Sequence, residues 1–136
     1  MTEKIKKIRC VIFDLDGTLL STLDTITYHL NFALRQYGLT EISVADTAAF
    51  IGNGARKLVM RAIGKNHERT DALVSSVLLK YNSAYDSDPL PLTFPYEGIS
   101  ELVDELVCRG ITLGVITNKP EPTAKKLVEH FFGGKF

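Results

Sequence analysis

Two short apolar runs most constrain how this chain can fold. Residues 8–13 and 111–116 are rich in β-branched side chains and show no clean apolar–polar alternation, a pattern typical of parallel strands covered on both faces. About a hundred residues separate the runs, whereas a simple strand–helix–strand crossover needs only about thirty. We therefore expect an α/β fold: a partial, Rossmann-like parallel-sheet core with a helical region inserted in its first crossover.

The residues between the runs carry only helical patterns. Apolar side chains recur at helical spacing in four stretches, which lie at about residues 21–37, 44–51, 55–63 and 70–85. Ser21 and Asp24 have the spacing of a capping box, and Gly38 is a stop signal for the first helix. The patterns predict a small helical bundle.

Three prolines mark the return from the bundle to the core. Pro89, Pro91 and Pro95 predict a linker at residues 89–95. Further amphipathic helices are expected before and after the second apolar run. The resulting division assigns residues 21–88 to the helical domain and residues 1–20 and 96–136 to an incomplete α/β core, because two strands alone do not make a stable parallel sheet.

The composition excludes several classes of protein. Of 136 residues, 45% are hydrophobic and 24% are charged, as in soluble globular domains. Sixteen basic and sixteen acidic residues balance, which argues against nucleic acid or an anionic membrane as partner. The first apolar run is too short for a signal peptide, and no stretch is long enough to span a membrane. Cys10 and Cys108 are expected to be buried, reduced thiols, so we expect a cytoplasmic location.

An acidic loop follows the first run and carries the strongest chemical signal. Residues 13–19 read Phe-Asp-Leu-Asp-Gly-Thr-Leu, and ligands of parallel sheets bind beyond such strand ends. One carboxylate of Asp14 and Asp16 can attack a phosphoryl group while the other exchanges protons with the leaving group and water. Gly17 and Thr18 are candidate phosphate-binding residues, and oxygen ligands from the loop suit Mg²⁺. The alternative is an acidic turn that closes the strand and caps the next helix.

The second run ends at Thr117, which a parallel neighbour would set beside Asp14. The Thr117 hydroxyl and the Asn118 amide, next to a helix N-terminus, are suited to bind phosphate. The alternative is an ordinary cap for the following helix. Lys119 is a candidate for binding phosphate or a substrate carboxylate, or else a solvated lysine at a helix start.

The glycine-containing segment between the second and third helical stretches is a candidate for selecting the substrate. Backbone amides at Asn53 and Gly54, together with the Arg56 guanidinium, would suit a small carboxylate. The alternative is a flexible joint between two helices.

These motifs resemble those of the haloacid dehalogenase-like (HAD) phosphohydrolases, and the helical insertion resembles their C1-type cap. Thr117-Asn118-Lys119-Pro120 and the cap loop are most similar to the phosphoglycolate phosphatase branch. The resemblance implies that Asp14 is the nucleophile and Asp16 the general acid/base. It also implies that both hold Mg²⁺, Asp14 through its side chain and Asp16 through its backbone carbonyl. The second aspartate favours phosphatase over dehalogenase chemistry.

The sequence departs from the family pattern after Thr117. The motif III lysine and the motif IV acidic pair do not follow before Phe136, so we expect a chain truncated after motif II. The leading hypothesis is a Mg²⁺-dependent phosphomonoester hydrolase that acts on a small phosphorylated metabolite, 2-phosphoglycolate, through an aspartyl-phosphate. Alternatives are a phosphosugar mutase of the same superfamily, an inactive fragment that serves as a binding module, and a phospho-accepting signalling domain. The sequence leaves the oligomeric state open.

Overall fold

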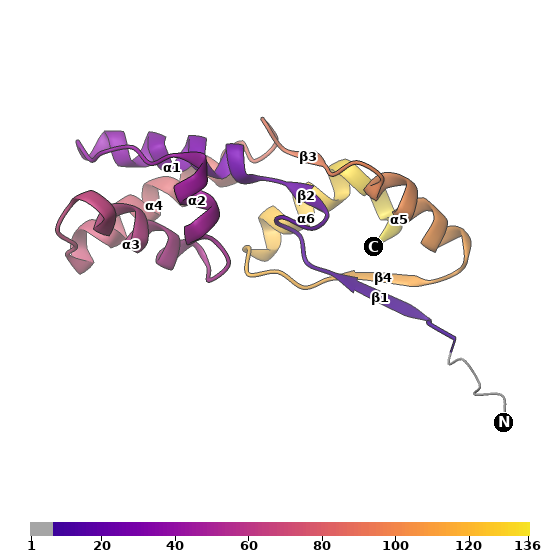
Figure 1. Ribbon diagram of the computed structural model, residues 1–136. Helices are drawn as coiled ribbons and strands as arrows, with labels where there is room; N and C mark the ends of the chain where they lie inside the picture. Colours follow the sequence, from indigo (N-terminus) through magenta and orange to yellow (C-terminus); the bar gives the residue numbers. More distant parts are fainter. Residues whose placement is uncertain (1–6) are drawn as a thin grey trace, which may run out of the picture.

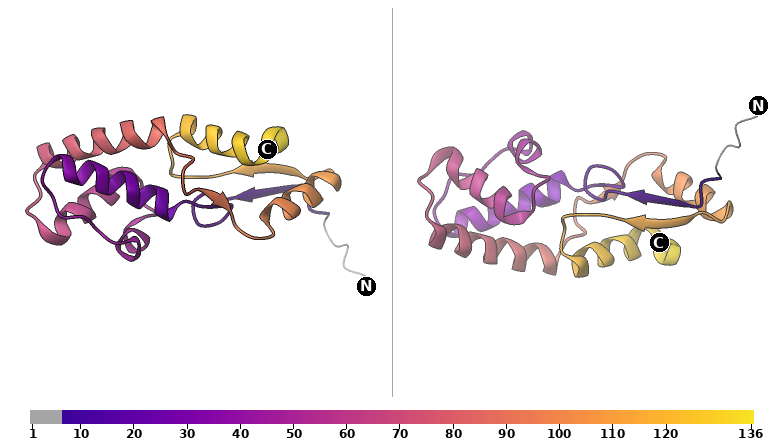
Figure 2. Two further views of the ribbon diagram at one scale, coloured as in Figure 1. Left: turned by 90° about the horizontal axis from the view of Figure 1, so that it is seen from above. Right: turned by 90° about the horizontal axis from the view of Figure 1, so that it is seen from below.

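The computed structural model describes residues 7–136, which form a helical half and an α/β half (Figure 1). Strands β1 (Cys10–Phe13) and β4 (Thr112–Val115) pair in parallel, with Cys10 opposite Thr112 and Phe13 opposite Val115. The prediction that the two apolar runs form a parallel sheet is confirmed. Both further views show the halves joined lengthwise, which gives an elongated molecule (Figure 2).

Two helices cover one face of this sheet. Helix α5 (Ile99–Cys108) precedes β4, and helix α6 (Glu121–Phe132) follows it, with a 3₁₀ turn at Gly133–Lys135 (Figure 1). Their apolar side chains bury those of the strands and of the acidic loop in one cluster, whose fully or nearly fully buried members are Leu15, Leu19, Leu20, Val103, Leu113, Ala124, Leu127 and Phe132.

The opposite face of the sheet is open. Ile12 is 58% exposed and Ile116 is 68% exposed, and no element of residues 7–136 lies over them. Cys10, on the same face, is exposed, as is Cys108 at the end of α5, so the prediction of buried cysteines is wrong. The expectation of strands covered on both faces fails here, because both helices of this half pack on the same side.

The helical half contains α1 (Leu23–Gln36), α2 (Val44–Phe50), α3 (Ala55–Asn66) and α4 (Asp71–Ser87). Their apolar faces meet in a second cluster, separate from the first, that includes Leu30, Val59 and Val77, none of which is exposed. The predicted helical bundle is therefore present. All four helices lie within residues 21–88, while the division into domains at those bounds stays a prediction.

The expected start of the first helix is corrected by the structure. Ser21 belongs to a two-residue strand, β2 (Leu20–Ser21), which pairs antiparallel with β3 (Phe94–Pro95). The N-cap of α1 is Thr22, with no side-chain capping bond, so the capping box of Ser21 and Asp24 does not form. The β2–β3 pair places the entrance and exit of the helical half side by side. None of the helices in residues 7–136 is both long and apolar enough to cross a membrane.

Candidate active site

A cavity of about 110 Å³ lies where the two halves meet. Its α/β wall consists of the loops that follow β1 and β4, and its helical wall comes from α1, the segment before α3, the start of α3, and α4. Its lining includes both chemically distinctive loops, with the residues Asp14, Asp16, Thr117, Asn118, Lys119 and Pro120. The polar side chains of the sheet edge thus face a helical wall that is partly apolar, with Ile26 and Leu58, and partly polar, with Asn82 and Asp86.

Asp14 and Thr117 reach this cavity because their strands are paired. The backbone N–H of Ile116 donates to the Phe13 carbonyl at 2.8 Å, so the chain continues from both strands at the same edge. The Leu15 N–H donates to Asp14 Oδ1 at 2.8 Å, which orients the carboxylate. The Thr117 hydroxyl oxygen accepts from the Lys119 N–H at 3.1 Å, so its own proton is available to an incoming ligand.

The Asp16 carboxylate is held from two directions. Thr22 Oγ1 donates to Asp16 Oδ1 at 2.7 Å, and Lys119 Nζ lies 3.3 Å from the same oxygen. The hydroxyl of Thr22, the N-cap of α1, therefore bonds to the acidic loop and does not cap its own helix. Asp16 is therefore fixed by the residue that opens the helical half and by a lysine from the other loop.

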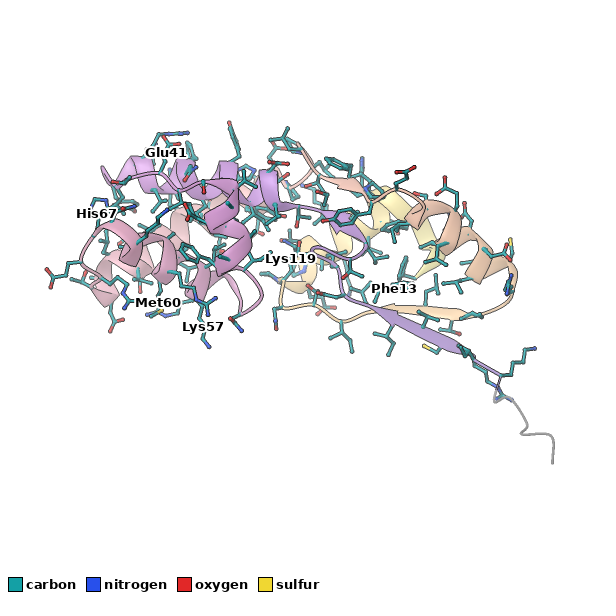
Figure 3. The ribbon with its side chains drawn as sticks, in the orientation of Figure 1. Phe13, Glu41, Lys57, Met60, His67 and Lys119 are labelled. Carbon is teal, nitrogen blue, oxygen red and sulfur yellow. The ribbon has the colours of Figure 1, made fainter. Side chains whose placement is uncertain are left out.

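Lys119 lies between the two halves (Figure 3). Its side chain is only 7% exposed, which excludes the alternative of a solvated lysine. Its ammonium donates to Tyr85 Oη at 3.0 Å and lies 4.2 Å from the centre of the Tyr85 ring. Burial lowers the pKa of Lys119, while the charges of Asp16 and Asp86 oppose that effect.

Two tyrosines of α4 complete the helical wall beside Lys119. Tyr81 and Tyr85 both line the cavity, and burial raises the pKa of each phenol above its ordinary value, with the negative charges of Asp16 and Asp86 adding to the shift. Both hydroxyls are therefore neutral near pH 7 and able to donate or accept a hydrogen bond.

The acidic loop and the cap loop contribute unequally to the cavity. Gly17 adopts a φ of 80° and, with Thr18, makes the exposed turn after Asp16 without lining the cavity. Gly52 and Gly54 do line it, and the Gly52 carbonyl accepts from the Asn118 amide at 2.8 Å. The segment predicted to select the substrate therefore contacts the loop after β4 through Asn118.

The structure does not bring Asn53 or Arg56 to the cavity. Asn53 Oδ1 accepts from Arg61 at 2.9 Å, and Arg56 pairs with Asp71 at 3.3 Å, at the start of α4. The guanidinium groups of Arg56 and Arg61 thus both bond to side chains of the helical half. Among the residues that the structure describes, Lys119 is the one cationic side chain in the cavity lining.

Comparison with known proteins decides the family. The model of the haloacid dehalogenase-like hydrolases matches residues 11–134. This chain belongs to that family. The resemblance carried by residues 13–19 and 117–120 is confirmed.

Several relatives with sequence similarity to this chain are named phosphoglycolate phosphatases. The chain is 38% identical to that of Rhodospirillum rubrum over 89% of this chain and 52% of the relative, and 33% identical to that of Cereibacter sphaeroides over 89% and 56%. It therefore spans about half the length of the curated relatives it matches. A crystal structure titled a predicted phosphoglycolate phosphatase from Haemophilus somnus 129PT superimposes with a TM-score of 0.87 at 25% identity, covering 97% of this chain and 65% of that one.

Magnesium at this site would need oxygen donors from the acidic loop. Within residues 7–136, no three His, Cys, Asp or Glu side chains come together as a metal site. Asp14 and Asp16 nevertheless supply the hard oxygen donors that Mg²⁺ takes, and Mg²⁺ is commonly held by one or two carboxylates together with water and phosphate oxygens. The residues present fit this ion.

Sequence reasoning missed Thr22, Tyr85 and Asp86. Asp86 accepts a hydrogen bond from Thr123 of α6, and all three residues join the halves around the cavity. The sequence gives little indication of these roles. A threonine before a helix is typical of a helix cap, and a tyrosine in an apolar stripe is typical of a core.

Proposed function

We propose that the protein is a Mg²⁺-dependent phosphomonoester hydrolase that acts on 2-phosphoglycolate through an aspartyl-phosphate intermediate. The observation that carries the proposal is the meeting of Asp14 and Thr117 in one cavity, at the ends of paired parallel strands. The phosphoglycolate phosphatases among its relatives support the same chemistry.

Asp14 is the proposed nucleophile. Its carboxylate attacks phosphorus, a carboxylate oxygen–phosphorus bond forms, and the bond from phosphorus to the substrate's alkoxide oxygen breaks. Because the Leu15 N–H binds Oδ1, the carboxylate is oriented before the substrate arrives. Preorganisation of this kind lowers the barrier, since the group need not be reordered during reaction.

Asp16 is the proposed general acid and base. It gives a proton to the departing alkoxide and then takes one from the water that hydrolyses the aspartyl-phosphate. The contacts with Thr22 and Lys119 keep its carboxyl group at the cavity wall during both steps.

Thr117, Asn118 and Lys119 are the proposed anion-binding residues. The Thr117 hydroxyl donates to a phosphoryl oxygen, the Asn118 amide joins the cap loop to the site, and the Lys119 ammonium offsets negative charge. Asp14 and Asp16 are the groups that would hold Mg²⁺, which when bound offsets the charge of the phosphoryl oxygens. Gly17 and Thr18 shape the loop that presents Asp14 and Asp16.

The size of the cavity favours a compact substrate. Pockets for drug-sized ligands enclose about 300–1,000 Å³, whereas this one encloses about 110 Å³. A two-carbon phosphomonoester fits a space of this size, whereas the open hollow of about 490 Å³ that Asp14 and Thr117 also line would admit a phosphosugar.

Phosphate release tests the proposal. Release from 2-phosphoglycolate is measured with and without Mg²⁺ for the unsubstituted chain, for Asp14→Asn and for Asp104→Asn, an exposed aspartate on α5 that serves as the matched control. We expect Mg²⁺-dependent release that Asp14→Asn reduces at least about a thousandfold and Asp104→Asn leaves unchanged. Equal release by Asp14→Asn would refute the nucleophile, and no release by a folded, unsubstituted chain would favour the binding-module alternative.

A further inference from the structure

Tyr85 belongs to the helical half but takes part in the charged contacts of the α/β half. It lies near the end of α4, its side chain is 3% exposed, and it lines the cavity. Both its hydroxyl and its ring contact the Lys119 ammonium, at 3.0 Å and at 4.2 Å to the ring centre. An aromatic face and a phenolic oxygen together form a directional binding site for a cation.

The Lys119 ammonium has few other contacts. Within residues 7–136, its one ion-pair partner is Asp16 Oδ1, at 3.3 Å. A lysine side chain has four flexible methylene groups, and its compact charge can point in many directions unless neighbours restrict it. Tyr85 therefore supplies much of the restriction that keeps the ammonium inside the cavity and beside Asp16.

Tyr85 is itself held by both halves. Its ring packs edge to face with His29 of α1 at 5.5 Å, and His29 is anchored by a 2.8 Å hydrogen bond to the Asp88 carbonyl. The end of α4 is joined to α6 by the hydrogen bond between Thr123 and Asp86, and both views show α4 and α6 meeting end to end (Figure 2). The position of Tyr85 therefore depends on how the helical half packs against the α/β half.

We propose that Tyr85 is a positioning residue, which sets the direction of the Lys119 ammonium when the helical half is docked on the α/β half and so prepares the cavity to bind an anion. This inference rests on the proposed function of the cavity as a phosphate site. According to this proposal, the helical half does more than exclude water from the cavity: it also positions the charge of Lys119.

Two variants separate the ring of Tyr85 from its hydroxyl. Tyr85→Phe keeps the ring under Lys119 and removes only the hydroxyl, whereas Tyr85→Leu removes both. Tyr37→Leu, at a partly exposed tyrosine whose hydroxyl donates to the Ser76 carbonyl, is the matched control. Each protein is checked for native fold by circular dichroism before measurement.

The first readout is the NMR shift of the Lys119 Hε protons, which a ring current moves upfield when the ammonium lies over an aromatic face. We expect an upfield shift in the unsubstituted protein, in Tyr85→Phe and in Tyr37→Leu, and its loss in Tyr85→Leu. This signature is measurable in the unsubstituted protein alone, so it tests the contact even if Tyr85→Leu does not fold. An unshifted Lys119 signal in the unsubstituted protein would overturn the proposal.

The second readout is titration with inorganic phosphate as the probe. We expect binding to weaken roughly three- to tenfold in Tyr85→Leu and by less than about twofold in Tyr85→Phe and Tyr37→Leu. Unchanged affinity in a folded Tyr85→Leu would overturn the proposal, as would the absence of saturable phosphate binding by the unsubstituted protein. Neither readout requires turnover, so failure of the hydrolysis mechanism at Asp14 is distinguished from failure of the role of Tyr85.

Discussion

The two halves of the molecule complete their packing to different extents. The apolar faces of α1–α4 close on one another in a single cluster. Among residues 7–136, α5 and α6 cover one face of the sheet of β1 and β4, and Ile12 and Ile116 stay exposed on the other face. Parallel sheets are usually buried on both faces, whereas in the described part of the chain this sheet is buried on one face.

This contrast bears on the candidate site, because the proposed chemistry belongs to the half that is less fully covered. Asp14, Asp16 and Thr117 extend from the two strands, while the helical half contributes the other wall and the contacts of Thr22 and Tyr85. The positions of these side chains therefore depend on how the halves dock, as well as on the sheet.

The largest expected effect tests the difference in packing directly. Leu30→Ala empties a fully buried position of the helical cluster and should lower the free energy of unfolding by about 2 to 5 kcal/mol. Ile12→Ala, on the open sheet face, should change it by less than about 0.5 kcal/mol. Urea unfolding of both variants measures the difference, and similar losses would show that the sheet face is covered in solution.

The next effect concerns the cation at the junction. Lys119→Met should weaken the binding of inorganic phosphate about tenfold to a hundredfold, because a buried charge-assisted hydrogen bond is lost. Lys125→Met, on the helix α6 that follows Lys119, is the control, since Lys125 is exposed and pairs with Glu121. Isothermal titration would detect the change. Equal affinities for the two variants would remove Lys119 from the anion site.

A smaller effect is expected at a helix start in the helical half. Ser43 caps α2 in a capping box with Asp46, so Ser43→Ala should cost about 1 kcal/mol of unfolding free energy. Ser100→Ala, in the first turn of α5, changes no side-chain cap and should be nearly neutral. Thermal unfolding compares them, and an equal cost at both positions would contradict the role of the capping box.

The smallest effect is a pH dependence of the same cap. The hydrogen bond from Lys65, followed by those from Ser43, lowers the pKa of Asp46 from 3.8 to about 2. The stabilisation by this carboxylate is therefore fully present above about pH 4 and is lost as the pH falls toward 2. The difference in unfolding free energy between the unsubstituted protein and Asp46→Asn should shrink over that range. A difference that is constant from pH 6 to pH 2 would argue against the shift.

Patterns that depend on local periodicity were predictable from the sequence. The two apolar runs gave the strands, and helical spacing of apolar residues gave α1 to α4, because burial of one face imposes that spacing. The two-residue strands β2 and β3 have no period to detect. Ser21 therefore looked like a helix cap although it pairs with Phe94 in a sheet.

Contacts between the halves were predictable only in part. The parallel pairing of the runs was enough to expect Asp14 and Thr117 at one edge. The burial of Lys119 depends on Tyr85, 34 residues away in the chain, and the direction of Arg56 depends on Asp71 at the start of α4. Such pairs are set by how helices pack, and the sequence around each residue carries no record of that.

The central claim is that the Asp14 carboxylate faces a phosphoryl-binding cavity that Thr117 and Lys119 share. Binding of beryllofluoride, a phosphoryl analogue that bonds to a carboxylate oxygen, tests it most directly when followed by ¹⁹F NMR in the presence of Mg²⁺. We predict bound fluorine signals, accompanied by amide shifts at Thr117 and Lys119, that vanish in Asp14→Asn. Bound signals that persist in Asp14→Asn, or amide shifts confined to residues remote from the cavity, would contradict the claim.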